Sequence, residues 1–183
     1  MPIPNILLKG TKRDFMIDAL LRTTPIDKTA PAERCLLGLV IPPWQRAEVW
    51  SQKQKIAFIE SIFLGFGTGY YVVNGADFDK EALPMPMSGW LLDGQQRLTA
   101  IRDFVEDKFA VFDDVIYGKM DKIVARRRFL HQPFPCFELE FTQDEQALKE
   151  LYRRLNFGGL PHTEADLKIL ETERRIMAKP PYA

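Results

Sequence analysis

The stretch WLLDGQQRLT, residues 90–99, carries the clearest structural and chemical signal in the chain. Its first three residues are apolar and predict a short buried strand, and Asp93-Gly94 ends that strand with a turn. From Gln95 onward, apolar residues recur at spacings of three and four, which is typical of a helix. The stretch therefore predicts a strand, a glycine turn and a helix in direct succession.

This order of elements favours the binding of an anion at the turn. The first N–H groups of a helix have no partner within it, and the helix dipole attracts negative charge to that end. Gly94 has no Cβ to hinder a phosphate, and Arg97 offers a guanidinium as a bidentate partner. An alternative stays open at this point, in which Asp93 is only a helix N-cap and Arg97 pairs with a surface acid. Gln95 and Gln96 would then be solvated.

Similar local signals predict the remaining elements. Ser51 with Gln54 resembles a capping box whose helix Gly65 would end, and Thr142 with Glu145 resembles a second box. The pattern favours an α+β fold, with a small mixed β-sheet flanked by helices and a helical C-terminal third. Helices are predicted over residues 11–22, 51–65, 142–155 and 163–178, from residue 95, and over part of 119–128; strands are predicted over 36–41, 70–73, 90–92, 109–112 and 135–141.

The composition bounds the class of protein. A chain of 183 residues suits one domain over residues 1–183, with an N-terminal helix and loop (1–33) and a C-terminal helical part (142–183). Lys and Arg number 25, as do Asp and Glu, so the net charge is zero and any DNA contact must be a local patch. The two widely spaced cysteines and the two histidines disfavour a structural zinc site. The sequence shows no signal peptide and no apolar run of membrane length. Together with the cysteine content, this indicates a cytoplasmic protein without a membrane span.

A second polar cluster follows Pro42-Pro43. The two prolines hold the backbone extended, so Gln45 and Arg46 are displayed from a stiff platform. Trp44 and Trp50 fit core or stacking roles better than contacts with a ligand.

Two other segments have plain structural explanations. A helix C-cap accounts for most of the Asn-Phe-Gly-Gly sequence at 156–159. The best candidate for a DNA contact is a basic run, which a solvated helix face explains equally well. The run comprises Lys119, Lys122, Arg126, Arg127 and Arg128.

Together, these clusters resemble the DGQQR-motif domains found at the N-terminus of modification-dependent restriction enzymes such as GmrSD, and in phosphorothioate-sensing defence proteins. Those domains belong to the ParB/sulfiredoxin superfamily. The likeness covers most of the chain in the expected order, and the DGQQRLT string of residues 93–99 is complete. The other matching elements are Gln45-Arg46, Trp50, Glu60-Ser61-Ile62, Gly65, Leu155-Asn156, Gly158 and residues 161–167.

The resemblance implies a ParB/sulfiredoxin-like fold with a pocket for ATP or another NTP and for Mg²⁺. Asp93 would hold Mg²⁺ or orient the nucleophile, and Arg97 would complement the charge of the transferred phosphoryl group. The implied nucleotide-binding residues are Gln45, Arg46, Gly94, Gln95, Gln96, Thr99 and Asn156. Residues 94–97 lack the catalytic cysteine of sulfiredoxin, which disfavours sulfinic-acid repair, and because the sequence ends at Ala183 we expect a domain without a fused nuclease.

The leading hypothesis is NTP-dependent phosphoryl transfer on modified DNA. In its sharpest form, the chain is a kinase that phosphorylates a hydroxymethylated pyrimidine base in DNA, as in phage hypermodification. Asp93 would take the hydroxyl proton, and Glu60 is a weaker candidate base.

The alternatives are an NTPase in a restriction or defence system, a nucleotide-gated sensor of modified DNA, and a non-catalytic ParB-like DNA-binding module. A metal nuclease is least favoured, because no carboxylates cluster beside histidines. The expected partners are DNA with modified bases, a nucleoside triphosphate, and a partner nuclease or modification enzyme. The expected location is the bacterial cytosol, and the protein could be encoded by a phage or by its host.

Overall fold

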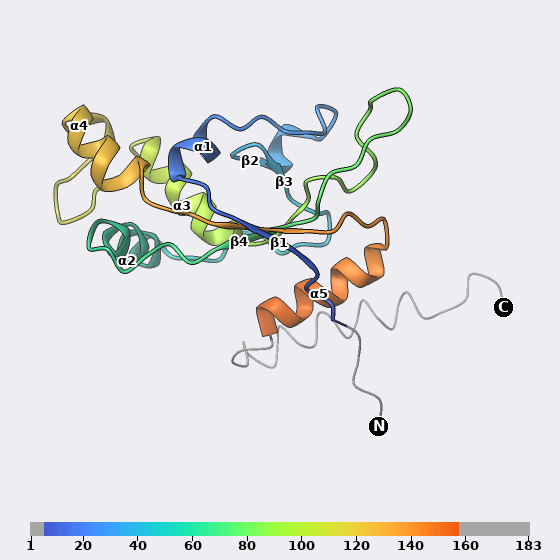
Figure 1. Cartoon of the computed structure of the whole chain (residues 1–183). Coiled ribbons are helices and arrows are strands. Elements are labelled where there is room, and N and C mark those ends of the chain that lie inside the picture. Colours follow the sequence, from blue (N-terminus) through green and yellow to red (C-terminus); the bar gives the residue numbers. More distant parts are fainter. Residues whose placement is uncertain (1–5, 158–183) are drawn as a thin grey trace.

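The computed structural model describes residues 6–157. Its α+β architecture confirms the predicted fold class, with a mixed four-stranded sheet in the order β1-β6-β4-β5 and helices against both faces (Figure 1). In chain order the elements are β1 (Gly10–Arg13), α1 (Ile17–Leu21), η1 (Ala32–Arg34), β2 (Cys35–Leu36), β3 (Leu39–Val40), α2 (Gln52–Phe63), β4 (Tyr71–Val73), β5 (Leu91–Asp93), α3 (Gln95–Val105), η2 (Tyr117–Lys119), α4 (Lys122–Ala125), the π-helix η3 (Arg126–Leu130), β6 (Cys136–Leu139) and α5 (Glu145–Phe157).

The sheet separates two apolar layers, because successive residues of a strand point to opposite faces. Tyr71 and Val73 face the larger layer, where α1, α2 and α3 pack, whereas Val72 faces the smaller layer under α5. β6 pairs antiparallel with β1 and parallel with β4, and β4 pairs antiparallel with β5. The turn after β5 therefore lies at one edge of the sheet, within reach of α5.

The structure confirms most elements with strong local signals. The capping box of Ser51 and Gln54 is present in both directions and opens α2, and Gly65 follows its last turn at a φ of +83°. Strands β4, β5 and β6 and helices α3 and α5 lie where the sequence predicts them, and residues 122–130 are helical as expected. The helix predicted over 163–178 lies outside the described residues.

The predicted helix over residues 11–22 is wrong in its first half. Gly10–Arg13 forms the edge strand β1, and the helix covers only Ile17–Leu21. All four residues of β1 are exposed, so the strand has no apolar alternation that a sequence could reveal. A Cβ on Gly10 would clash with the carbonyl oxygen of Glu138, because this edge approaches β6 closely.

Two predicted strands are also wrong. Residues 36–41 do not form one strand, because Leu37 and Gly38, at φ values of +48° and +77°, turn the chain into the β2–β3 hairpin. Residues 109–112 form no strand either, because positive φ values at Phe112 and Asp113 turn the chain there and leave a single bridge between Val111 and Val115.

The capping box predicted for Thr142 and Glu145 is wrong as well. Asp144 caps α5 instead, since its Oδ1 accepts hydrogen bonds from the N–H groups of Gln146 and Ala147 at 3.0 Å. Thr142 Oγ1 accepts from the N–H of Asp144 and so supports the true cap. Within residues 6–157, no helix has the length and apolar character needed to cross a membrane.

Candidate functional site

The Gly94 turn sits where β5 passes into α3. Gly94 adopts a left-handed conformation, with φ +99°, and a Cβ at this position would lie 2.6 Å from the Cβ of Tyr71 in the neighbouring strand. Both the backbone conformation and the close approach require glycine. No side chain caps α3, so its first N–H groups are left for another acceptor.

Asp93 does not act as the helix cap that the alternative explanation assumed. Its Oδ2 accepts a hydrogen bond from Arg97 Nη2 at 2.8 Å, and the same nitrogen donates to the carbonyl oxygen of Tyr70 at 2.7 Å. The partner of Arg97 is therefore the carboxylate at the turn itself rather than a remote surface acid, and these contacts hold the guanidinium over the turn.

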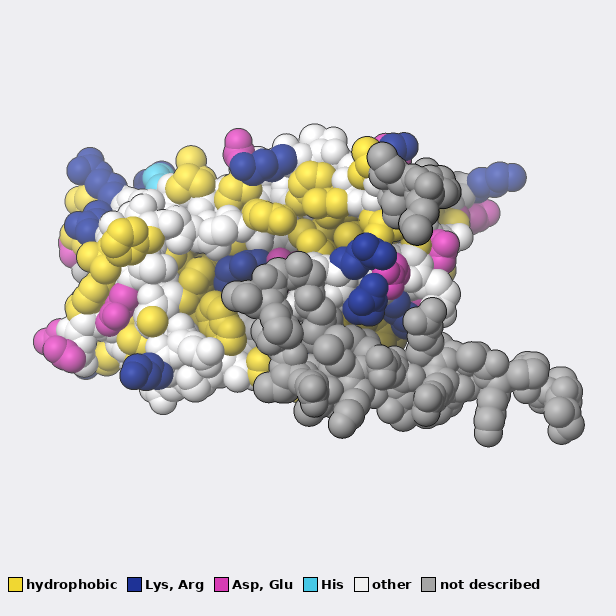
Figure 2. All heavy atoms as spheres, turned by 90° about the horizontal axis from the view of Figure 1, so that it is seen from below, with side chains coloured by type: hydrophobic (Ala, Val, Ile, Leu, Met, Phe, Trp, Pro, Cys, Tyr) yellow, Lys and Arg dark blue, Asp and Glu magenta, His cyan; other side chains and the backbone are white. Residues whose placement is uncertain are grey.

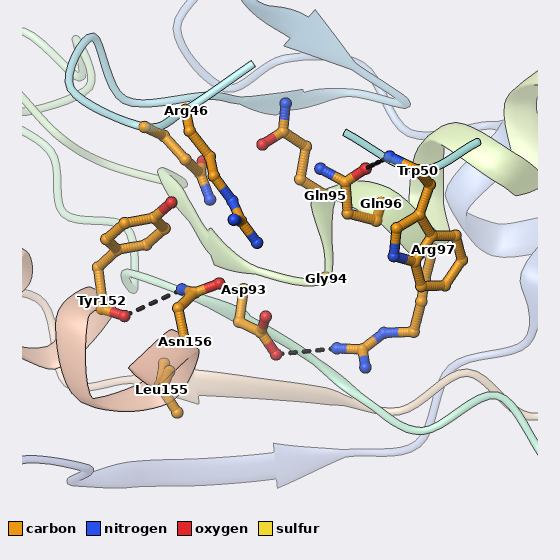
Figure 3. Close-up of a pocket in the computed structure, with 11 residues that line it drawn as sticks. Arg46, Trp50, Asp93, Gly94, Gln95, Gln96, Arg97, Tyr152, Leu155 and Asn156 are labelled. Atoms are coloured by element: carbon orange, nitrogen blue, oxygen red, sulfur yellow. Dashed lines mark hydrogen bonds and ion pairs between the residues drawn. The ribbon is translucent and has the colours of Figure 1, made fainter. Parts of the chain in front are cut away.

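A cavity of about 280 Å³ opens at this turn (Figure 3). Three separate parts of the chain form it: the loop after Pro43, the β5–α3 turn and the last turns of α5. Its lining residues are Gln45, Arg46, Trp50, Asp93, Gly94, Gln95, Gln96, Arg97, Tyr152, Leu155 and Asn156.

Gln96 holds the loop that forms one wall of the cavity. Its Oε1 accepts hydrogen bonds from the backbone N–H groups of Val49 and Trp50, at 3.1 and 3.0 Å. At the start of the same loop, Gln45 Nε2 donates to the carbonyl oxygen of Leu92 at 3.4 Å. The two glutamines thus tie the loop to β5 and α3.

Arg46 extends from this loop toward Asp93 and the Gly94 turn, and the amide of Asn156 faces the same space (Figure 3). Within the described part of the chain, Arg46 forms no ion pair, whereas Arg97 is bound to Asp93. Burial raises the pKa of Tyr152, and the adjacent Arg46 partly opposes that rise. The cavity therefore holds one uncompensated positive charge beside uncapped helix N–H groups.

Two polar atoms of the lining are buried without a hydrogen-bond partner in residues 6–157. These atoms are Gln45 Oε1 and Arg97 Nε. A buried polar group without a partner costs about 1–3 kcal/mol, so such groups are rare outside sites that bind a ligand or water. Within the same residues, Arg34 Nη2 and Trp44 Nε1 are also unpartnered but do not line the cavity. In the cavity, Arg97 Nε offers a hydrogen bond to an anion, whereas Gln45 Oε1 can only accept one from a hydroxyl group or water.

The structure brings together eight of the residues that the sequence analysis selected, namely Gln45, Arg46, Asp93, Gly94, Gln95, Gln96, Arg97 and Asn156. Glu60 and Thr99 do not line the cavity. Thr99 is buried within α3, and Glu60 Oε1 accepts a hydrogen bond from the N–H of Phe112 at 2.8 Å. Glu60 thus supports a turn at another place in the fold.

Two lining residues, Tyr152 and Leu155, were not among the predicted site residues, although Leu155 belongs to the matching Leu155-Asn156 element. Asn156 Nδ2 donates to the carbonyl oxygen of Tyr152 at 2.9 Å, so both residues belong to one turn of α5. The spacing of residues 152, 155 and 156 places them on one helix face, which is the signal that the sequence offered. Gly158 and residues 161–167 lie outside the described residues.

The five basic residues proposed for DNA contact lie away from the cavity, in η2, α4 and η3, and their side chains are exposed. Arg126 Nε donates to His131 Nε2 at 3.0 Å, and Arg128 Nη2 donates to the carbonyl oxygen of Phe63 at 2.8 Å. Basic and acidic side chains are interspersed over the face in Figure 2 instead of gathering in one basic field. The basic run is Lys119, Lys122, Arg126, Arg127 and Arg128.

Comparison with known proteins identifies the family of this chain. No curated protein and no solved structure matches it, so the ParB/sulfiredoxin likeness of the fold stays a prediction. Residues 31–131, more than half of the chain, match the family described as the GmrSD restriction endonuclease, N-terminal domain. The match spans both the Gln45-Arg46 loop and the Gly94 turn. The chain belongs to the family of GmrSD restriction endonuclease N-terminal domains.

Proposed function

We propose that the cavity binds the phosphates of a nucleoside triphosphate and that the chain transfers the terminal phosphoryl group on, or in response to, modified DNA. The observation that carries this proposal is the buried and unpartnered Nε of Arg97, a hydrogen-bond donor, beside the uncapped start of α3. An anion bound at the start of α3 would accept hydrogen bonds from the free N–H groups and would also be attracted by the positive charge of Arg46.

The cavity suits the polyphosphate part of a nucleotide. Its volume of about 280 Å³ is near the lower end of the range of about 300–1,000 Å³ for ligand pockets. We therefore expect the phosphates to be enclosed and the base to extend beyond the described lining. Arg97 would stabilise charge that develops on the transferred group.

Magnesium fits the donors that the cavity offers. Asp93 uses Oδ2 for Arg97, which leaves its second oxygen for a cation. Within residues 6–157, no three acidic, histidine or cysteine side chains gather to hold a metal. This suits Mg²⁺, which is usually held by one or two carboxylates together with substrate phosphates. When bound, Mg²⁺ would neutralise negative charge on the phosphate oxygens.

The sharpest form of the proposal is a kinase whose acceptor is the hydroxyl of a hydroxymethylated pyrimidine in DNA. The bond between the γ-phosphorus and its bridging oxygen breaks, a bond to the acceptor oxygen forms, and the nucleoside diphosphate leaves. In this form the second oxygen of Asp93 would orient the hydroxyl and receive its proton instead of holding Mg²⁺, because Asp93 is the carboxylate that lines the cavity and its Oδ2 binds Arg97.

Membership of a restriction endonuclease family favours a second candidate, in which water is the acceptor. The chain would then be an NTPase that controls a partner nuclease, or a sensor that binds nucleotide without turnover. These forms share the same phosphate cavity and differ in what receives the phosphoryl group.

The decisive experiment supplies γ-labelled ATP and Mg²⁺ together with ordinary or hydroxymethylated DNA. Label on the DNA supports the kinase, free labelled phosphate supports the NTPase, and nucleotide binding without either product supports the sensor. Asp93→Asn should abolish turnover, whereas Asp113→Asn, an exposed aspartate outside the cavity, should keep it. Absence of nucleotide binding by the wild-type protein would overturn the proposal.

A further inference from the structure

The loop between α2 and β4, residues 64–70, has an unusual backbone (Figure 1). Gly65, Gly67 and Gly69 all adopt positive φ values, of +83°, +88° and +70°. A Cβ on Gly65 or Gly67 would meet nothing within 4 Å, so this part of the loop stands away from the rest of the protein. The glycines let the chain turn at three places within a few residues.

The turns present apolar side chains to solvent. Of the large apolar residues in residues 6–157, Phe66 is the most exposed, at 82%, and Leu64 and Tyr70 are exposed by 60% and 42%. Isolated exposed apolar residues are ordinary, but three within one seven-residue loop make this loop a candidate binding surface.

The loop is anchored on both sides of this patch. The N–H of Phe66 donates to the carbonyl oxygen of Ser61 at 2.9 Å, and Thr68 Oγ1 donates to the carbonyl oxygen of Pro133 at 2.6 Å. The backbone that carries Phe66 is therefore held in place. Binding through its ring costs less conformational entropy than binding through a residue on a mobile segment.

The same loop contacts the candidate site directly. The carbonyl oxygen of Tyr70 accepts the 2.7 Å hydrogen bond from Arg97, and a Cβ on Gly69 would lie 3.5 Å from Arg97 Nη1. Arg97 thus lies between the cavity, which it lines, and the aromatic loop, which it contacts. A ligand held by the loop would have part of its length next to the cavity.

A basic side chain of η3 contacts the end of α2, where the loop begins. Arg128 donates to the carbonyl oxygen of Phe63, three residues before Phe66, and the exposed Arg126 and Arg127 precede it in η3. Exposed aromatic rings beside arginines match the chemistry of a nucleic-acid strand, because bases stack on the rings while phosphates pair with the cations. In a chain of zero net charge, such a patch supplies the local attraction that DNA needs.

The geometry points to Phe66 as a base-stacking residue: its ring stacks on a DNA base and holds the strand so that a neighbouring nucleotide reaches the cavity at Arg97. This inference rests on the proposed function, since it takes DNA as the substrate. A base must leave the duplex stack before an enzyme can act on it, and an aromatic wedge stabilises that state.

The test compares Phe66→Ala and Phe66→Trp with Phe78→Ala, a matched variant of a phenylalanine that is 52% exposed in another loop. Oligonucleotides containing 2-aminopurine, a base whose fluorescence falls on stacking, report both affinity and stacking. Phe66→Ala should bind about 5- to 150-fold more weakly, the range that one base–aromatic stack gives, and should lose the quenching. Phe66→Trp should restore both properties, and Phe78→Ala should match the wild type. Equal effects of Phe66→Ala and Phe78→Ala, or no effect of either, would overturn the inference.

Binding of MgATP, measured separately by calorimetry, keeps the two proposals apart. Phe66-dependent DNA binding without MgATP binding supports the stacking role and removes the phosphoryl-transfer proposal. MgATP binding without any DNA binding by the wild-type protein removes the stacking role and leaves the phosphate cavity standing.

Discussion

Asp93, just before the start of α3, and Asp103, in its last turn, have very different surroundings. Asp103 is 4% exposed, and its carboxylate accepts hydrogen bonds from Lys55 at 2.5 Å, from Lys108 at 2.9 Å and from Arg102 at 2.8 Å. Burial alone would raise the pKa of Asp103, but these bonds lower it to about 2. Lys55 also pairs with Glu48, which joins the cluster to the loop of the candidate site.

Asp93 has a single cationic partner, Arg97, and lies beside buried atoms without partners. The Asp103 cluster satisfies its own charges and so holds α2, α3 and the loop together, whereas the Asp93 site leaves buried polar atoms without partners and, in our proposal, is completed by a polar ligand. The contrast indicates a structural role for the Asp103 cluster and agrees with the proposed chemical role of the Asp93 site.

The largest effect is expected for Arg97→Ala, which should lower phosphoryl-transfer turnover by at least about 10³-fold, as for arginines that stabilise this transition state. The fold should persist, because Arg97 is a partly exposed residue on the first turn of α3. Turnover is measured with labelled ATP and folding by thermal denaturation.

Arg22→Ala is its matched control. Arg22 pairs with Asp18 at 2.7 Å with the same four-residue spacing, but neither residue lines the cavity. Turnover by Arg97→Ala equal to that of Arg22→Ala would remove Arg97 from the mechanism.

Asp103→Asn should reduce the free energy of unfolding by about 3–5 kcal/mol at pH 7, because it leaves Lys55 and its neighbours without their shared carboxylate. In the wild type, the folded-state pKa of about 2 lies below the unfolded value of 3.8, so the unfolded chain binds more protons between these values. This stabilisation is present above about pH 4 and is lost as the pH falls toward 2. Urea denaturation at a series of pH values should show a shallower acid decline in the variant than in the wild type. Parallel curves for the two proteins would show that Asp103 carries no such linkage.

Gly94→Ala and Gly67→Ala compare the stability cost of a methyl group in a crowded turn with its cost in an open turn. Both Gly94 and Gly67 have positive φ, so alanine at either costs about 1–2 kcal/mol of backbone strain. At Gly94 the added methyl also meets Tyr71, whereas at Gly67 it meets nothing within 4 Å. Gly94→Ala should therefore be less stable than Gly67→Ala by about 1–3 kcal/mol, as measured by urea denaturation. Equal losses would show that the turn yields to the methyl group.

Features determined by residues close together in the sequence were predictable, whereas features that depend on residues far apart in the sequence were not. The capping box of α2 and the glycine turn before α3 are set by residues within four positions, and both were predictable. The strand β1 depends on Glu138 and its neighbours, about 125 positions away, and has no pattern of its own. Motif residues of the cavity were identified because they lie in short strings.

The remaining wall of the cavity depends on tertiary packing. Tyr152 and Leu155 repeat with the other apolar residues of α5, so nothing in their spacing separates a cavity wall from a core contact. Glu60 illustrates the reverse case, since it lies in a matching motif but its side chain is bound to a distant turn. Which face of a helix meets a cavity is decided by the sheet that the helix packs on, and local sequence does not encode that.

The smallest effect is expected for Glu60→Ala. Its carboxylate accepts the hydrogen bond of the Phe112 N–H, at the start of the positive-φ turn formed by Phe112 and Asp113, and it lies outside the cavity. Loss of that bond should lower the free energy of unfolding by about 0.5–1.5 kcal/mol, while turnover of labelled ATP per folded molecule should stay within about twofold of the wild type, since a factor of two is under 0.5 kcal/mol. Glu60→Gln, which keeps an acceptor oxygen, should recover most of the stability. A large fall in turnover by both variants would restore Glu60 as a base, and Asp93 would then no longer be the carboxylate that carries the chemistry.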